Sequence, residues 1–153
     1  MKYTNSKRLQ VQQVEITQSY VEKLFNDCNL LYFNNKLPPI PITLITSTIV
    51  NGDFTYDINF ETNMLLNMQI QINTSNRRTR NKLIATMVHE MLHYKVALEL
   101  TPEEIKRAGW YYKDGQLDKF NEIMHAGQYA HTNKWLEYAN TINNTYNLNI
   151  NLK

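Results

Sequence analysis

The chain has 153 residues, of which 42% are hydrophobic and 20% charged, with a formal net charge of +2. This length allows one globular domain with a real core and leaves no room for a second folding unit. The charge balance is too weak to require nucleic acid as a partner, so any such hypothesis depends on local basic clusters. Cys28 is the only cysteine, which excludes an intrachain disulfide and a cysteine-based zinc ribbon.

The N-terminal 13 residues are polar, and no run of eighteen apolar residues occurs anywhere in the chain. Neither a secretory signal nor a membrane-spanning segment is therefore predicted. We expect an intracellular, cytoplasmic protein without a membrane partner, in which residues 1–13 are flexible.

Helical periodicity over residues 14–33 predicts an N-terminal helix whose buried face carries Leu24, Cys28 and Leu31. Turn-forming asparagines and the two prolines at 38 and 39 end it. The next 40 residues have the composition of strands.

Residues 40–50 are rich in aliphatic and β-branched side chains, and Asn51-Gly52 is typical of a two-residue hairpin turn. Residues 53–60 then return as a second strand, and residues 66–73 alternate apolar and polar side chains as a third. The pattern predicts a small antiparallel sheet of about three strands. The third strand is a candidate edge to which an extended peptide substrate could add.

Residues 79–98 are predicted to form the next helix, and they contain the motif His89-Glu90-Met91-Leu92-His93. Two histidines four residues apart lie one turn apart on one face, so both can bind a single zinc ion, with Glu90 beside them. A buried histidine pair without a partner would be costly. A stripe of apolar residues favours burial of this helix against the sheet: Ile84, Met87, Val88, Met91, Leu92 and Val96.

Two further helices are predicted after the motif. Thr101-Pro102-Glu103-Glu104 is a capping box that starts a short helix, which we expect to end near Gly109 and to be followed by a loop at 110–115. Residues 132–146 carry Trp135 and other apolar residues on one face, which predicts a closing helix. The fold class expected is α+β.

A catalytic zinc usually takes three protein ligands and keeps its fourth position open. The two histidines after the motif, His125 and His131, each precede an aromatic residue by four positions. His131 stands immediately before the closing helix and is the preferred candidate, although spacing alone leaves His125 open. A carboxylate ligand is the other alternative, and Glu122 is then the best placed.

These parts predict one Zn²⁺ ion and peptide hydrolysis. The metal would polarise the scissile carbonyl and activate water, while Glu90 would serve as general base and return the proton to the leaving amine. The expected partner is a protein or peptide substrate.

With these residues identified, the chain resembles the SprT-like family of zinc metallopeptidases, which includes the Spartan proteases that degrade proteins crosslinked to DNA. Three segments carry the resemblance: Leu31-Tyr32-Phe33-Asn34-Asn35-Lys36-Leu37-Pro38, the His89 to His93 motif, and His131-Thr132-Asn133-Lys134-Trp135 before a helix. The resemblance implies a zincin-like single domain over residues 1–153, His131 as the third ligand, and DNA or DNA-bound proteins as partners.

The chain departs from the family pattern in two ways. The distance from His93 to His131 is longer than usual, so residues 100–129 look like an insertion. The zinc ribbon that follows the protease domain in many members is absent.

A basic cluster precedes the motif helix and is the candidate nucleic-acid contact: Arg77, Arg78, Arg80 and Lys82. A solvated basic loop explains the same residues equally well, because phosphate contact needs a cluster but a cluster does not need phosphate.

Two rival functions remain open from the residues alone. One is a metal-containing binding module without catalysis, of a phage or mobile-element type. The other is a His-His-Glu zinc peptidase unrelated to the SprT-like family.

Overall fold

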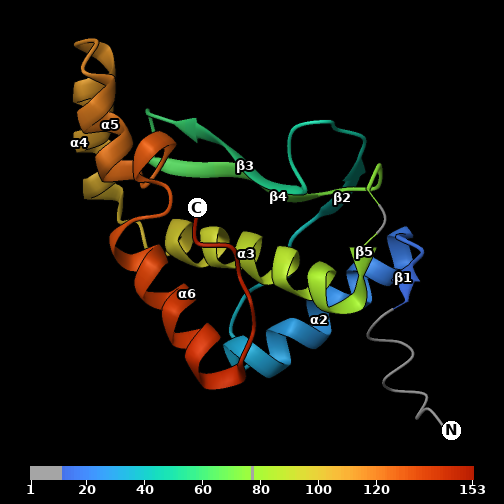
Figure 1. The fold of residues 1–153 in the computed structure, drawn as a ribbon. Coiled ribbons are helices and arrows are strands. Elements are labelled where there is room, and N and C mark those ends of the chain that lie inside the picture. Colours follow the sequence, from blue (N-terminus) through green and yellow to red (C-terminus); the bar gives the residue numbers. More distant parts are fainter. Residues whose placement is uncertain (1–11, 77) are drawn as a thin grey trace, which may run out of the picture.

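The computed structural model describes residues 12–76 and 78–153, and Figure 1 shows an α+β fold. The prediction of a flexible N-terminus falls mostly on residues outside this range. The elements in chain order are β1 (Gln13–Val14), α2 (Gln18–Phe33), β2 (Ile42–Ile45), β3 (Gly52–Asn59), β4 (Met64–Asn73), β5 (Arg78–Thr79), α3 (Arg80–Leu98), α4 (Pro102–Lys113), α5 (Leu117–Met124), the short 3-10 helix η1 (Gly127–Tyr129) and α6 (Asn133–Tyr146).

The main sheet has the strand order β2-β4-β3 and is mixed, because β2 runs parallel to β4 whereas β3 and β4 form an antiparallel hairpin. The prediction of an antiparallel sheet joined at Asn51-Gly52 was therefore wrong. The alternating strand β4 is central, so it is not an edge for a peptide. The edges are β2 and β3.

A buried asparagine explains why the chain does not turn tightly at Asn51-Gly52. The Asn73 side chain is 0% exposed, accepts a hydrogen bond from the Ser47 backbone and donates to the carbonyls of Ser47 and Val50. These contacts hold residues 46–51 as a wide loop that carries the chain from one edge of the sheet to the other.

Helix α2 begins at Gln18, later than predicted, because Thr17 caps it by accepting a hydrogen bond from the Tyr20 amide. Leu24 and Cys28 are buried as predicted. Leu31 is 59% exposed, so its expected place on the buried face was wrong.

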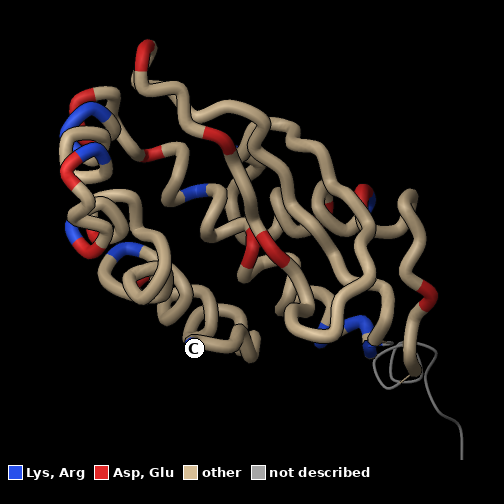
Figure 2. The backbone as a smooth tube through the Cα atoms, turned by 90° about the horizontal axis from the view of Figure 1, so that it is seen from above, with Lys and Arg blue, Asp and Glu red and all other residues tan. Residues whose placement is uncertain are grey.

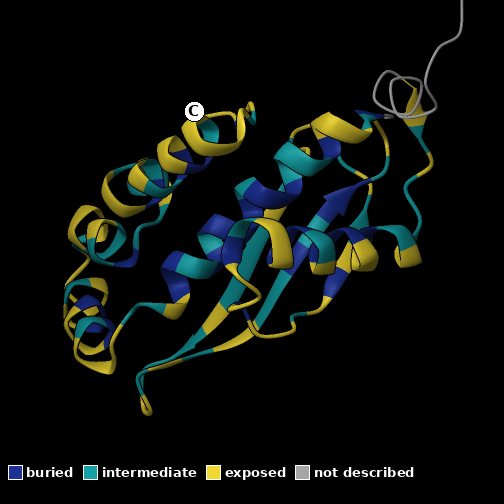
Figure 3. Cartoon of the chain, turned by 90° about the horizontal axis from the view of Figure 1, so that it is seen from below, coloured by how far each residue is buried: buried dark blue, intermediate teal, exposed yellow. Residues whose placement is uncertain are grey.

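Helix α3 lies between the sheet and the helices α2 and α6, and it is buried along most of its length (Figures 1 and 3). Leu83, Met87 and Met91 are all 0% exposed and join the core with Ile70 and Ile72 of β4. Each such side chain contributes about 1.5–3 kcal/mol by leaving water. This burial fixes the helix that carries the motif.

The segment predicted as an insertion forms the hairpin of α4 and α5, which projects from the C-terminal end of α3 (Figure 1). The predicted capping box is present at Thr101 and Glu104. The helix continues past Gly109, however, because this glycine serves packing: a Cβ there would lie 2.9 Å from the Phe60 ring. The loop predicted at 110–115 is therefore mostly helix, and α5 was not predicted.

After α6, residues 147–153 turn back towards α3 and pass across it (Figure 1). Ile150 in this segment is only 2% exposed and belongs to the main core. Among the described helices, none combines the length and apolar character needed to cross a membrane.

Candidate metal centre

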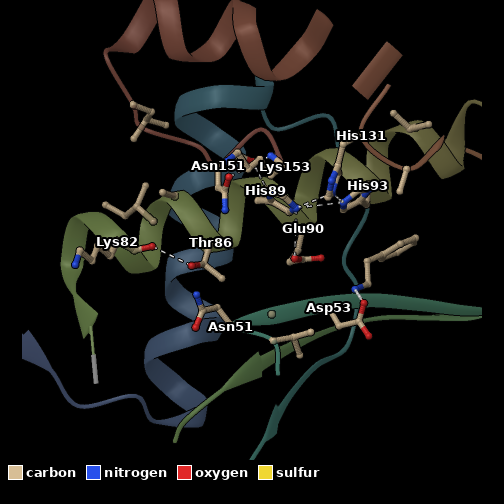
Figure 4. Close-up of a pocket in the computed structure, with 18 of the residues that line it drawn as sticks. Asn51, Asp53, Lys82, Thr86, His89, Glu90, His93, His131, Asn151 and Lys153 are labelled. Atoms are coloured by element: carbon tan, nitrogen blue, oxygen red, sulfur yellow. Dashed lines mark hydrogen bonds and ion pairs between the residues drawn. The ribbon is translucent and has the colours of Figure 1, made fainter. Parts of the chain in front are cut away.

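Three histidines from two elements meet at one point above α3 (Figure 4). Helix α3 supplies His89 and His93 one turn apart, and His131 comes from the turn that leads into α6. The Nε2 atoms of His89 and His131 are 3.1 Å apart, those of His93 and His131 3.0 Å, and those of His89 and His93 3.3 Å. The structure thus brings together the motif pair and the preferred third ligand.

The spacing of these nitrogens fits a metal ion. Ligands of a tetrahedral zinc with Zn–N bonds of about 2.0–2.1 Å lie about 3.3 Å from one another, close to the separations observed. Each nitrogen of a neutral imidazole either donates or accepts a hydrogen bond, so the three Nε2 atoms cannot form hydrogen bonds in all three pairs. A cation that accepts three lone pairs accounts for the arrangement.

A backbone carbonyl fixes the orientation of the His89 ring. The Nδ1 atom of His89 is 3.0 Å from the carbonyl oxygen of Asn151. Because a carbonyl oxygen can only accept, Nδ1 carries the hydrogen and Nε2 presents its lone pair to the other two histidines. This is the ring form that a metal ligand needs.

Trp135 supports all three rings. Its side chain is 0% exposed, and its ring centroid lies 4.7 Å from that of His89, 5.3 Å from His93 and 4.4 Å from His131. Its indole N–H donates to the His89 carbonyl at 3.4 Å. The aromatic residue four positions after His131 therefore restricts the rings by packing.

Glu90 is 6% exposed, and one of its carboxylate oxygens lies 4.0 Å from Nε2 of His89. Burial raises the pKa of Glu90 to about 8, and the charge of Asp53 adds to this effect. Burial together with the neighbouring imidazoles lowers the pKa of His89 to about 4 and that of His93 to about 3. Both imidazoles are therefore neutral at pH 7 and able to coordinate a cation.

Neither alternative ligand belongs to this cluster. His125 ends α5 in the left-handed conformation, with φ of 52°, and within the described part of the chain its buried Nδ1 has no hydrogen-bond partner. Glu122 is exposed on α5. The ring nitrogens that lie within 4.8 Å of one another are those of His89, His93 and His131.

Arg78, from the candidate nucleic-acid cluster, has a structural position instead. It is 6% exposed, and its guanidinium donates to the carbonyls of Asn51 and Asn73 and to the Thr86 hydroxyl. Burial lowers its pKa. Its Nε also donates to the Asn76 carbonyl, so four protein oxygens hold the guanidinium and it is not free to contact phosphate, which corrects the prediction for Arg78.

The remaining members of that cluster do not form one patch in the described residues. Arg80 and Lys82 are both exposed, but two positions along a helix rotate the side chain by about 200°. Lys82 accordingly faces the histidine side, whereas Arg80 lies beside Tyr20 and Asp27 of α2. Arg77 lies outside the described residues. Figure 2 shows basic and acidic positions interleaved along the α4–α5 hairpin.

A cleft of about 1390 Å³ runs along α3 and contains the histidines and Glu90. Beyond His93 its walls are mainly apolar, formed by Phe54, Tyr56, Val96, Ala97, Met124 and Ala126. On the other side of His89 the walls are mixed: apolar residues such as Ile49, Ile84 and Leu148 are interspersed with the polar residues Asn51, Lys82, Thr86, Asn149 and Asn151. The two ends therefore differ in chemistry.

Sequence reasoning missed several residues of this cleft. The sequence pattern predicts Gly52 in a hairpin turn and Asp53 at the start of an antiparallel strand, both without a functional role, and it does not assign residues 147–153 to the site. The contact of Asn151 uses its backbone carbonyl, which no residue type reveals. Among these residues, only Asn51 and Gly52 form a recognisable sequence pattern, and that pattern predicts a tight hairpin turn instead of a wall of the cleft.

No protein-family model and no curated protein sequence matches this chain. The interpretation of the site therefore depends on the chemistry and geometry of its own residues.

Proposed function

We propose that this chain is a zinc-dependent endopeptidase with zincin-like architecture, of the SprT-like type. The observation that carries the proposal is the triangle of Nε2 atoms from His89, His93 and His131 with the Glu90 carboxylate beside it in an open cleft. This combination of three neutral nitrogen ligands and an adjacent carboxylate is what metal-assisted hydrolysis requires.

In the proposed reaction, His89, His93 and His131 would hold a zinc ion, which would supply polarisation of the scissile carbonyl and a lowered pKa of water. Glu90 accepts the proton of the attacking water and transfers it to the departing amine. A divalent cation held by these histidines would favour the ionised form of Glu90 and so offset the effect of burial on its pKa. Trp135 and the Asn151 carbonyl keep the imidazoles in place during turnover.

We infer that an extended polypeptide binds along the free edge of β3. Gly52, Asp53 and Phe54 of this edge strand line the cleft opposite α3. An edge strand offers unpaired backbone groups with which an extended chain can form a further strand. The apolar end of the cleft, beyond His93, would then accept an apolar side chain of the substrate.

Hydrolysis of unfolded casein by the purified protein tests this function. We expect cleavage that is abolished by a chelator, restored by Zn²⁺, and abolished in Glu90→Gln although this variant still binds metal. Glu122→Gln is the matched control, because it makes the same chemical change on the exposed face of α5. Full metal occupancy in the wild type with no hydrolysis of any protein would favour the non-catalytic binding module instead.

The link to DNA-bound proteins is a separate part of the proposal and derives from the family resemblance. Arg80 and Lys82 are the described members of the predicted cluster that remain exposed. Binding of single-stranded DNA that weakens steeply with salt and is lost in a double Arg80→Ala, Lys82→Ala variant would support it. Absent or salt-independent binding would remove DNA from the proposal and leave the peptidase function untouched.

A further inference from the structure

The segment that follows α6, residues 147–153, forms part of the wall around the histidines. In Figure 4, Asn151 and Lys153 lie beside His89. Asn147, Leu148, Asn149, Asn151 and Lys153 all line the cleft. The Asn151 carbonyl is 3.0 Å from His89 Nδ1, and this contact links the segment to the three histidines.

A single side chain on α6 holds this segment. The Asn143 Oδ1 atom accepts a hydrogen bond from the Ile150 amide at 2.9 Å, and its Nδ2 donates to the Ile150 carbonyl at 3.2 Å. One amide side chain thus satisfies both backbone groups of one residue. The Ile150 side chain, 2% exposed, anchors the same residue in the core.

The next peptide unit carries the carbonyl that meets His89. The Ile150–Asn151 peptide is planar, so holding the Ile150 carbonyl also fixes the Cα of Asn151, and only the φ and ψ angles of Asn151 separate this atom from the carbonyl that meets His89. A carboxylate at position 143 could accept from the Ile150 amide but could not donate to its carbonyl, and an aliphatic side chain could do neither. The amide at 143 is therefore suited to hold this turn of backbone.

We propose that Asn143 is a positioning residue for the metal ligand His89, acting through the backbone of Ile150 and Asn151. It does not touch the metal site. It determines which ring nitrogen of His89 carries the hydrogen, and so leaves Nε2 free to coordinate. The inference rests on the three-histidine site of the proposed function but not on peptide hydrolysis.

Two measurements on Asn143→Ala test this role, both made without substrate. In competition with a chromophoric chelator, we expect the variant to bind Zn²⁺ about 10- to 100-fold more weakly, the usual cost of losing an outer partner of a ligating histidine. In the metal-free protein, side-chain ¹⁵N chemical shifts should show His89 hydrogenated at Nδ1 in the wild type. In the variant they should show a mixture of the two ring forms.

Two controls separate positioning from a general loss of stability. Asn144→Ala makes the same change at the exposed neighbouring position and should leave Zn²⁺ affinity and the ring form unchanged. Leu24→Ala removes a core side chain of α2 and should lower the melting temperature while keeping the Nδ1–H form.

The proposal is overturned if Asn143→Ala keeps wild-type Zn²⁺ affinity and the wild-type ring form. It is also overturned if Leu24→Ala, at an equal loss of stability, changes both as much. A protein that binds zinc in this Asn143-dependent way but cleaves nothing would instead contradict the peptidase function alone.

Discussion

Gly52 on β3 lies so close to Glu90 on α3 that a Cβ atom at this position would be 3.1 Å from the Glu90 Cγ. The same Cβ would lie 3.0 Å from Thr86 Cγ2 and 3.2 Å from the Gln71 carbonyl oxygen. The backbone oxygen cannot move aside as a flexible side chain can. A glycine here lets the edge strand approach the proposed general base directly.

Replacing Gly52 by alanine is expected to displace the Glu90 side chain and lower kcat about 10-fold or more, since small misplacements of reacting groups are costly. Zinc content should not change, because none of the three histidines contacts this position. Thr55→Ala, on the opposite face of the same strand, is the control. Equal kcat values for Gly52→Ala and the wild type would contradict the proposed role of Glu90 at this location.

Ala126→Phe tests the apolar end of the cleft. Ala126 lies in the cleft wall beyond His93 and packs in the small cluster that includes Met124 and Tyr56. A phenyl ring would fill space that we assign to a substrate side chain. We expect kcat/KM to fall about 10-fold for peptides with a bulky apolar residue next to the cleaved bond and to change little for peptides with alanine there. A uniform fall for both peptides would argue against this assignment.

Arg78→Ala is expected to destabilise the fold by about 2–3 kcal/mol, because the buried carbonyl of Asn73 and the partly buried carbonyl of Asn51 lose their donor. Arg78→Lys should not restore stability, since an ammonium group cannot reproduce the planar set of donors that reaches four oxygens. Urea unfolding measures the effect, with exposed Arg80→Ala expected within about 0.5 kcal/mol of the wild type. An Arg78→Ala protein as stable as the wild type would contradict the structural role.

The metal-free protein should show a pH dependence of stability with two opposing limbs. The pKa values of His89, about 4, and His93, about 3, lie below the unfolded value of about 6.5. The unfolded chain therefore binds their protons first, and stability falls as pH drops below about 6.5. Glu90 acts in the other direction: its pKa of about 8 lies above the unfolded value, so stability falls as pH rises through the range from about 4.5 to 8.

Glu90→Gln isolates the second limb, because glutamine imitates the protonated carboxyl. After chelation of metal, this variant should exceed the wild type in free energy of unfolding at pH 8, and the difference should shrink towards pH 5. Urea unfolding at the two pH values measures this. A difference independent of pH would show that Glu90 does not titrate as described.

The sequence predicts the helix with the metal motif over residues 79–98, and the structure has it at Arg80–Leu98. The agreement is close because the cap and the apolar stripe of this helix are local features. The preference for His131 came from its place before a helix with Trp135 one turn on, and the structure places that tryptophan beneath all three rings. The cap, the apolar stripe and the spacing of His131 and Trp135 are all patterns among residues close together in the sequence.

The features that could not be predicted from the sequence depend on contacts between residues far apart in the chain. The mixed sheet depends on Asn73 holding the 46–51 loop through Ser47, 26 residues earlier in the chain, and an asparagine at the end of a strand gives no local sign of this. Gly109 resembled a helix end but serves a contact with Phe60. The link from Asn143 to His89 passes through backbone atoms, which residue types do not reveal.

Metal content of four proteins tests the central claim most directly: the wild type, His131→Ala, His125→Ala and Glu122→Ala, each purified without added metal, then loaded with Zn²⁺ and freed of excess. The account predicts one zinc ion per chain in the wild type, in His125→Ala and in Glu122→Ala, and loss of the ion in His131→Ala. A wild-type chain that takes up no zinc, or a His131→Ala chain that retains it, would contradict the account.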